Sequence, residues 1–491
     1  MIDLKLLFFT LLSIIFLVIA FIKWKHINLS KKQKHIFSLV PLSVLLVTHI
    51  LMQPEIHNDI MNEWDSWNKP RIVYKKFNDV NKSYETAGLY QFTFMSTFRS
   101  IFPHNRYNKE EYERVDSYFA SKQVPEHNEY TDIFKGKNVI AVMMESIDGW
   151  VIDQNTTPTL YEMMNNSINF CDYNSPLFGT GFTFNSEFAF NTGLFTPLSA
   201  VNAANFSTNS FPNSLANLFK DAGYTTNSFH FNSPEFYNRS IMHRAFGYKK
   251  YHSVKDYLTD ETEAELDSNL LKNDELYKNM ISETPFFDFI ITYSAHLPYK
   301  GESKKLDLAK KYRPDLINED INEEINNMQI LASDTDEFFR QLLERLENDR
   351  LLENTVIVAF TDHFSYGISD EKLLNEIRGD KSIYNVPAFI YAKGIEPINI
   401  DKPMMTIDFL PTLVNLFGLS KEAKYIGNDI LNPLNKGFVF YENWGFKDDE
   451  MTYFHSDEKH NENIDHIEKQ NARVKESMEI NDIIVLGDYY K

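Results

Sequence analysis

Two apolar stretches near the amino terminus stand out from the rest of the chain. Residues 4–22 carry one charge, at their edge. As a helix they would span about 28 Å, close to the roughly 30 Å hydrocarbon thickness of a bilayer. They predict a membrane helix rather than a cleaved signal peptide, because Asp3 interrupts the basic start and no small-residue cleavage site follows. Residues 36–52 are shorter and contain Pro41 and His49, so a second span and a buried or interfacial helix both remain open.

The segment between these stretches is basic. It contains Lys23, Lys25, Lys31, Lys32 and Lys34. Lysine-rich loops of membrane proteins stay in the cytoplasm. If both stretches span the bilayer, everything after residue 53 is extracytoplasmic.

From residue 138 onward, short β-rich runs alternate with helical stretches. The β-rich runs are residues 138–144, 224–230, 286–294, 355–363 and 386–393. Between Ile325 and Leu346, apolar residues recur at steps of three and four, which predicts an amphipathic helix. This alternation over some 300 residues predicts a doubly wound, mostly parallel α/β sheet whose ligands lie beyond the carboxyl ends of the strands.

These patterns divide the chain into four expected parts. They are a membrane anchor at 1–53, a helical linker at 54–136, an α/β domain at 137–445 and a charged tail at 446–491. In the tail we expect a solvated helix that ends in a short strand, IIVL. A metal-binding tail is the alternative, because it contains His455, His460 and His466.

Composition excludes several classes of protein. The 491 residues include 49 Lys and Arg against 69 Asp and Glu, a net charge of −20, which disfavours nucleic-acid binding. Cys171 is the single cysteine, so an internal disulfide and a thiolate metal cage are both excluded. With 43% hydrophobic and 24% charged residues, the chain is neither wholly disordered nor a many-pass transporter.

Candidate metal ligands follow two of the predicted strands. Glu145 comes directly after 138–144, and Asp362 and His363 come at the end of 355–363. Carboxylate and imidazole groups at one sheet edge suit a divalent cation, whereas each acid alone is more typical of a helix cap. Thr183 follows two glycines at the expected start of a helix, where it is either an N-cap or a nucleophile facing the positive helix end.

Six ordered motifs resemble those of lipoteichoic acid synthases, phosphoglycerol transferases of the sulfatase-like, alkaline-phosphatase superfamily. They are Glu145 with TPTL at 157–160, SEF at 186–188 behind a threonine, NR at 238–239 with FGY at 246–248, YSAHLPY at 293–299, TDH at 361–363 with VPAFIY, and the late segments 406–419 and 425–430. The resemblance covers about residues 137–430. It implies a sulfatase-like catalytic domain.

The resemblance also implies roles for individual residues. Glu145, Thr183, Asp362 and His363 match a site that holds one divalent cation, Mn²⁺ or Mg²⁺, with Thr183 as both metal ligand and nucleophile. His230, Arg239 and His296 match contacts to the phosphoglycerol group, and Tyr237 stands where the family has tryptophan. His296 is also a candidate general acid. Without the order of the motifs, the local sequence would favour a surface charge for Arg239 and an exposed loop histidine for His296.

The function implied is transfer of glycerol phosphate from phosphatidylglycerol to a lipid-linked polymer or glycan of the cell envelope. The enzyme would be anchored in the membrane with its catalytic domain outside. The chain departs from the family at Phe182–Phe188, usually Lys-Thr-Ser-Asp-Ser-Glu-Phe, and has at most two spans where five are typical. Alternatives are phosphoethanolamine transfer, hydrolysis by a sulfatase or phosphatase of the same fold, and a non-catalytic surface-binding paralogue.

Overall fold

A computed structural model describes most of the chain from residue 107 onward. The described residues are 84, 88–89, 92–97, 107–122, 127–179, 182–197, 203, 206–258, 260–281, 284–419, 424–442, 444–454 and 463–491. The expected membrane spans, the basic loop between them, and most of the expected linker lie outside these residues. Among the described helices, none is both long and apolar enough to cross a membrane.

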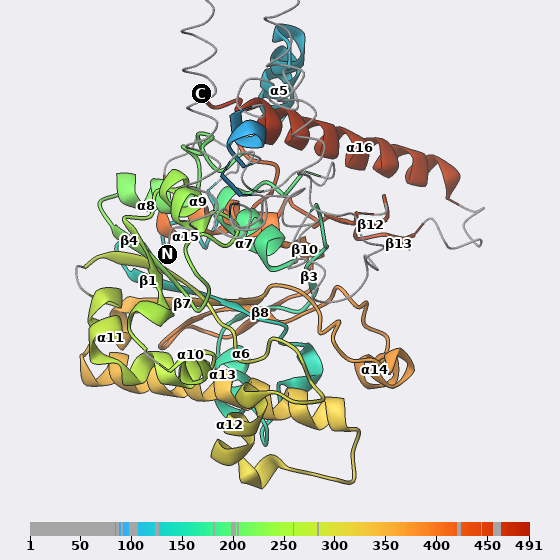
Figure 1. Cartoon of the computed structure of the whole chain (residues 1–491). Helices are drawn as coiled ribbons and strands as arrows, with labels where there is room; N and C mark the ends of the chain where they lie inside the picture. Colours follow the sequence, from blue (N-terminus) through green and yellow to red (C-terminus); the bar gives the residue numbers. More distant parts are fainter. Residues whose placement is uncertain are drawn as a thin grey trace, which may run out of the picture.

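An eight-stranded sheet forms the centre of the molecule (Figure 1). Its order is β5-β4-β6-β1-β7-β8-β2-β9, and of these strands β8 alone runs opposite to the others. The strands are β1 Asn138–Met144, β2 Ile168–Phe170, β4 Thr225–His230, β5 Lys250–Ser253, β6 Phe286–Ile291, β7 Thr355–Thr361, β8 Ala388–Ala392 and β9 Ile398–Ile400. The predicted mostly parallel α/β sheet is confirmed.

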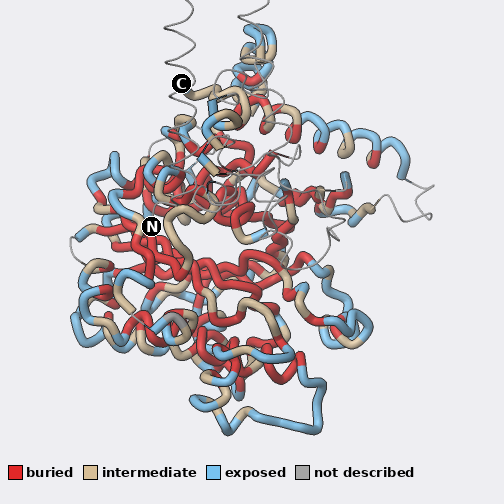
Figure 2. The backbone as a smooth tube through the Cα atoms, viewed as in Figure 1, coloured by how far each residue is buried: buried red, intermediate tan, exposed pale blue. Residues whose placement is uncertain are grey.

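Successive side chains of β1 point to opposite faces of the sheet, and from Val139 onward those on both faces are apolar. Both faces of the sheet are therefore covered by other elements. Val139, Ala141 and Met143 join one hydrophobic core cluster, and the residues between them join the other. Every residue of β1, β6 and β7 is buried, as expected for central parallel strands. Figure 2 shows this buried layer running through the middle of the molecule.

Helices pack on each face of the sheet. One face carries α6 Pro158–Asn165, α10 Glu261–Ala264, α11 Asp274–Met280, α12 Lys304–Tyr312, α13 Glu323–Asn348 and α14 Glu371–Arg378. The other carries α7 Phe182–Thr192, α8 Leu215–Asp221, α9 Arg239–Phe246 and α15 Phe409–Phe417. The two layers make a doubly wound domain.

The long helix expected around Ile325–Leu346 is α13. It begins after Asn322, whose side chain accepts hydrogen bonds from the backbone N–H groups of Glu324 and Ile325. Glu323 and Glu324 in the first turn complement the positive end of the helix.

A further group of elements completes the described structure. It contains α5 Lys109–Ser121, α16 Ile464–Gly487, a small sheet of β11 Val439–Phe440, β12 Phe446–Lys447 and β13 Thr452–Tyr453, and the pair β3 Tyr173–Asn174 with β10 Met404–Met405. α16 crosses the molecule beside α5 (Figure 1). The boundaries of the four expected parts stay predictions.

The strand expected in the tail is wrong, because IIVL lies inside α16. Val474, Met478 and Val485 of this helix belong to the main core. The spacing of these residues continues the helical period through the β-branched Ile483, Ile484 and Val485. Tertiary packing therefore overrides the strand propensity of the β-branched residues. The expected solvation holds for the exposed first residues, Ile464 and Asp465, but not for the carboxyl half.

Candidate active site

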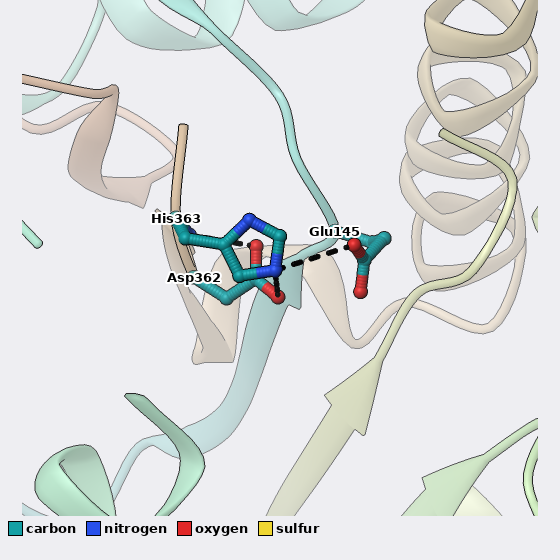
Figure 3. A group of neighbouring side chains, drawn as sticks. All are labelled: Glu145, Asp362 and His363. Atoms are coloured by element: carbon teal, nitrogen blue, oxygen red, sulfur yellow. Dashed lines mark hydrogen bonds and ion pairs between the residues drawn. The ribbon is translucent and has the colours of Figure 1, made fainter. Parts of the chain in front are cut away.

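Three candidate ligands meet at the carboxyl edge of two neighbouring parallel strands. Met144 of β1 pairs with Thr361 of β7, and the residues that follow them are Glu145, Asp362 and His363. One ligand atom from each lies within 4.8 Å of the others. His363 Nε2 is 3.5 Å from Glu145 Oε1 and 3.2 Å from Asp362 Oδ2 (Figure 3). All three side chains are buried.

Hydrogen bonds to the backbone orient Asp362 and His363. Asp362 Oδ1 accepts from the N–H groups of Ser146 and His363, both at 2.8 Å. This leaves Asp362 Oδ2 buried and without a hydrogen-bond donor. His363 Nδ1 is 3.0 Å from the carbonyl of Phe364, which can only accept, so Nδ1 carries the proton. The lone pair of Nε2 therefore faces the carboxylates.

This arrangement fits a divalent cation. Burial and the charge of Glu145 raise the pKa of Asp362 well above its usual value, which shows how unfavourable two carboxylates are here without a compensating charge. Two carboxylates and a neutral imidazole are a ligand set that Mg²⁺, Mn²⁺ and Zn²⁺ accept. Oδ2 of Asp362, which is buried and has no hydrogen-bond partner among the described residues, supplies an oxygen that can bind the cation.

Thr183 lies beside the three ligands. It stands in the first turn of α7, with Oγ1 3.3 Å from Glu145 Oε2 and 3.5 Å from His363 Nε2. The structure thus brings together all four residues predicted for the metal site. Thr183 as a whole is half-buried, in contrast to the fully buried Glu145, Asp362 and His363.

Three serines support this cluster, and the sequence analysis included one of them, Ser186, only as part of the SEF motif. Ser146 Oγ donates to Glu145 Oε1 at 2.8 Å, and Ser146 has a φ of +54°. The hydroxyls of Ser175 and Ser186 both donate to the backbone carbonyl of Asp362. The SEF motif marks Ser186, whereas neither Ser146 nor Ser175 has a distinctive sequence signal. A left-handed backbone at a non-glycine residue is a conformation that functional sites often hold.

Arg239 is buried and held by Glu187 of the SEF motif. Its Nε and Nη2 lie 2.9 and 2.8 Å from Glu187 Oε2. Glu187 Oε1 is also 2.6 Å from His243 Nε2, a residue that the sequence analysis missed. Burial raises the pKa of Glu187, but Arg239 and His243 outweigh this and lower it to about 2. Arg239 Nη1 is buried and has no hydrogen-bond partner among the described residues.

Tyr237 connects Arg239 to the helix that carries Thr183. Its ring stacks on Phe184 of α7, with centroids 5.0 Å apart, and lies 5.2 Å from the Arg239 guanidinium. Tyr237 and Asn238 have φ values of +56° and +55°. Two successive non-glycine residues in the left-handed region are strained, which is consistent with a functional loop.

His230 ends β4, on the same edge of the sheet. Its Nδ1 donates to the carbonyl of Ile291 at 3.0 Å, and its Nε2 lies 3.3 Å from Asn232 Nδ2. Burial and the nearby Arg239 lower the pKa of His230 to about 3, so the ring is neutral at physiological pH.

His296 lies on the loop after β6. Its Nδ1 donates to the carbonyl of Leu297 at 2.8 Å, and its ring stacks on Tyr293 at 4.9 Å. Lys305 Nζ lies 4.9 Å from the Tyr293 ring and donates to the carbonyl of His296. Burial lowers the pKa of His296, although the charge of Glu145 opposes this shift.

Comparisons with known proteins agree with this geometry. The sulfatase family profile matches residues 137–419, more than half of the chain. Lipoteichoic acid synthase 2 of Bacillus subtilis is 25% identical over 455 residues, which cover 86% of this chain and 68% of that protein.

Two solved structures share the fold. The lipoteichoic acid synthase LtaP from Listeria monocytogenes superposes with a TM-score of 0.63 at 21% identity, covering 76% of this chain and 98% of that one. A protein in the alkaline phosphatase superfamily from Vibrio parahaemolyticus superposes with a TM-score of 0.53 at 19% identity. The superposition covers 79% of this chain and 97% of that one. The chain therefore belongs to the sulfatase family, has the fold of the alkaline phosphatase superfamily, and is a homologue of lipoteichoic acid synthases.

Proposed function

We propose that this protein is a metal-dependent transferase that moves glycerol phosphate from phosphatidylglycerol to a cell-envelope polymer or glycan through a phosphorylated Thr183. The observation that carries the proposal is the position of the Thr183 hydroxyl, 3.3 and 3.5 Å from two members of a buried ligand cluster. Similarity to lipoteichoic acid synthases over 86% of the chain supports glycerol phosphate as the transferred group.

In the first half-reaction, Thr183 Oγ attacks the phosphorus of the donor. The bond between phosphorus and the diacylglycerol oxygen breaks, and Glu145 Oε2 is placed to accept the threonine proton. A divalent cation held by Glu145, Thr183, Asp362 and His363, Mn²⁺ or Mg²⁺, would lower the pKa of the hydroxyl and neutralise the phosphate oxygens.

Other residues hold the phosphoglycerol group and deliver a proton. Arg239 Nη1, which has no partner among the described residues, would donate to a phosphate oxygen. His230, at the end of β4, and Tyr237, whose ring lies 5.2 Å from the Arg239 guanidinium, would contact the same group. His296 gives a proton to the departing diacylglycerol oxygen. A bound phosphate favours its charged form and so offsets the lowered pKa.

In the second half-reaction, an acceptor hydroxyl attacks the same phosphorus. The bond from phosphorus to Thr183 Oγ breaks, the acceptor proton passes to His296, and Thr183 recovers its proton. A membrane anchor at residues 4–22, with 36–52 as a second span, would keep the site beside its lipid donor. The five lysines between these segments favour an extracytoplasmic catalytic domain. A reporter fused after Lys491 that is active only in the cytoplasm would contradict this orientation.

The direct test uses the full chain with phosphatidylglycerol labelled in its headgroup. We expect diacylglycerol release and a glycerophosphate adduct on the peptide that contains Thr183, both abolished in Thr183→Ala. Normal turnover in Thr183→Ala, or an adduct on Ser186, would refute the assignment. Release of free phosphate from simple esters would favour a hydrolase, and preference for phosphatidylethanolamine would favour phosphoethanolamine transfer. The absence of turnover and of a bound cation would favour a non-catalytic binding paralogue.

A further inference from the structure

Two large aromatic side chains next to Thr183 remain exposed. Phe182 and Tyr366 are 42% and 38% exposed, and we call this pair the aromatic rim. Their rings meet edge to face, with centroids 5.1 Å apart and planes at 77°. Both also contact the ring of His363, at 5.9 and 5.0 Å. The aromatic rim therefore borders the candidate ligand cluster itself.

Close packing fixes Tyr366 in this position. A Cβ on the next residue, Gly367, would lie 2.8 Å from Tyr299 and 3.0 Å from Leu297, so only glycine allows the two loops to approach so closely. The N–H of Tyr366 donates to the carbonyl of Phe364 at 2.9 Å. Within the described part of the chain, no hydrogen bond involves the Tyr366 hydroxyl.

Three cations of the described residues, Arg239, Lys305 and Lys300, contact protein groups. Arg239 is 1% exposed and paired with Glu187, and its free Nη1 is assigned to the transferred phosphate. Lys305 is 3% exposed and donates to the carbonyls of Tyr293 and His296. Lys300 is exposed but lies 3.0 Å from Glu324. An acceptor that is itself a polyanion would find little compensating charge here, on a chain whose net charge is −20.

We propose that the aromatic rim binds the apolar C–H face of an uncharged sugar ring in the acceptor and so directs a sugar hydroxyl to the phosphorus held at Thr183. This inference rests on the proposed function. Aromatic faces offer large, rigid apolar area, and tyrosine adds a polar tip that suits a hydroxylated ligand. The exposed polar residues Ser369 and Asp370 border the loop. An acyl chain would instead require a wider apolar patch.

The step balances as a simple transfer. A new bond forms between the sugar oxygen and phosphorus, and the bond from phosphorus to Thr183 Oγ breaks. The sugar proton passes to His296, and Thr183 Oγ takes back the proton that Glu145 accepted in the first half-reaction. No oxidant, reductant or further co-reactant is required.

The test measures how the Thr183 adduct divides between acceptor and water. The full chain is loaded from labelled phosphatidylglycerol and then offered a neutral glucose disaccharide or glycerol phosphate. We expect Phe182→Ala and Tyr366→Ala each to lower the ratio of disaccharide transfer to hydrolysis roughly tenfold. Phe182→Trp should retain the ratio. Tyr312→Ala, which removes an equally exposed ring from α12, is the control and should leave the ratio unchanged.

Each other outcome overturns the proposal in a distinguishable way. An unchanged ratio in both alanine variants means that the rings do not bind the acceptor. Preference for glycerol phosphate irrespective of the rings means that the acceptor is anionic, and a raised KM for phosphatidylglycerol with a constant ratio means that the rim binds lipid. If the wild-type chain releases no diacylglycerol, the proposed function fails. Saturation-transfer NMR with the disaccharide then tests separately whether the aromatic rim binds sugar. If it does, the wild-type chain gives a saturation-transfer signal on the disaccharide and Phe182→Ala loses it.

Discussion

Glu187 and Arg239 form an ion pair that is closed off from solvent. Arg239 Nη2 lies 2.8 Å from Glu187 Oε2, and the two side chains are 1% or less exposed. The pair joins α9 to α7, the helix that carries Thr183. Its position therefore determines how Thr183 and Arg239 are placed relative to each other.

Replacing Glu187 by glutamine should destabilise the fold strongly. It leaves the Arg239 charge buried and uncompensated, which costs about 3–5 kcal/mol. Glu479→Gln breaks an exposed pair with Arg114 and should cost under about 1 kcal/mol. Since the pKa of Glu187 is lowered to about 2, its contribution is complete above the usual value near 4.5 and declines as pH falls toward 2. Denaturant unfolding at pH 7 and pH 3 checks this, and equal losses for both variants would contradict it.

Removing one candidate ligand should remove the cation. Asp362→Asn takes away a charge from the cluster, so we expect loss of stoichiometric Mn²⁺ binding and of diacylglycerol formation, with an unchanged circular dichroism spectrum. Ser146→Ala, which removes the hydrogen bond to Glu145, should weaken cation binding about 10- to 100-fold. Calorimetric titration measures both. Asp256→Asn changes an exposed carboxylate and serves as the control. Full Mn²⁺ affinity in Asp362→Asn would eliminate the proposed site.

His296→Ala should slow the first half-reaction by about 10²- to 10⁴-fold, the usual contribution of one general acid. Thr183 should still become loaded, because the nucleophile and candidate ligands remain. Rapid-quench measurement of the Thr183 adduct separates this effect from slow acceptor transfer. A wild-type loading rate in His296→Ala would show that another group protonates the leaving oxygen.

Lys305 should act through His296 as a positioning residue. Lys305→Met removes the Lys305 donor from the carbonyl of His296 and one of the two donors to the carbonyl of Tyr293, whose other donor is the His296 N–H, and it removes the cation from the Tyr293 ring. We expect kcat to fall about 10- to 100-fold, with little change in KM and a shift of the His296 ring signals in NMR spectra. Lys304→Met alters the exposed neighbour and should behave like the wild type. A loss of stability without any change in the His296 signals would indicate a purely structural role.

Asp288 should make the wild-type fold sensitive to pH. It is buried in β6, and neither carboxylate oxygen has a hydrogen-bond partner of acceptable geometry among the described residues. Burial raises its pKa well above the usual value, although the neighbouring Asn227 of β4 opposes this shift. The unfolded chain releases this proton near pH 4 while the folded chain retains it, so stability is lost as pH rises above about 4. Asp288→Asn should therefore be about 1–3 kcal/mol more stable than the wild type at pH 8, with the difference vanishing near pH 4. Thermal unfolding across this range measures it, and a constant difference would exclude the explanation.

The sequence alone determined the central sheet and the edge at which the site lies. Runs such as 139–144 and 356–360 are apolar throughout because these strands are covered on both faces, a local property that the sequence displays directly. Acids and histidine directly after such strands, at Glu145, Asp362 and His363, could be assigned to one sheet edge because parallel strands end together. The sulfatase family was also recognisable from the order of its motifs.

Only the tertiary structure decided which side chains those residues meet. Ser175 and Ser186 both reach the carbonyl of Asp362, and His243 completes the pair of Glu187 and Arg239, through contacts between segments far apart in the chain. No local pattern encodes such contacts. The same holds for residues 483–486, whose β-branched sequence favours a strand. They are helical because α16 buries them against the core, and the free energy of that burial exceeds the small intrinsic preference for a strand.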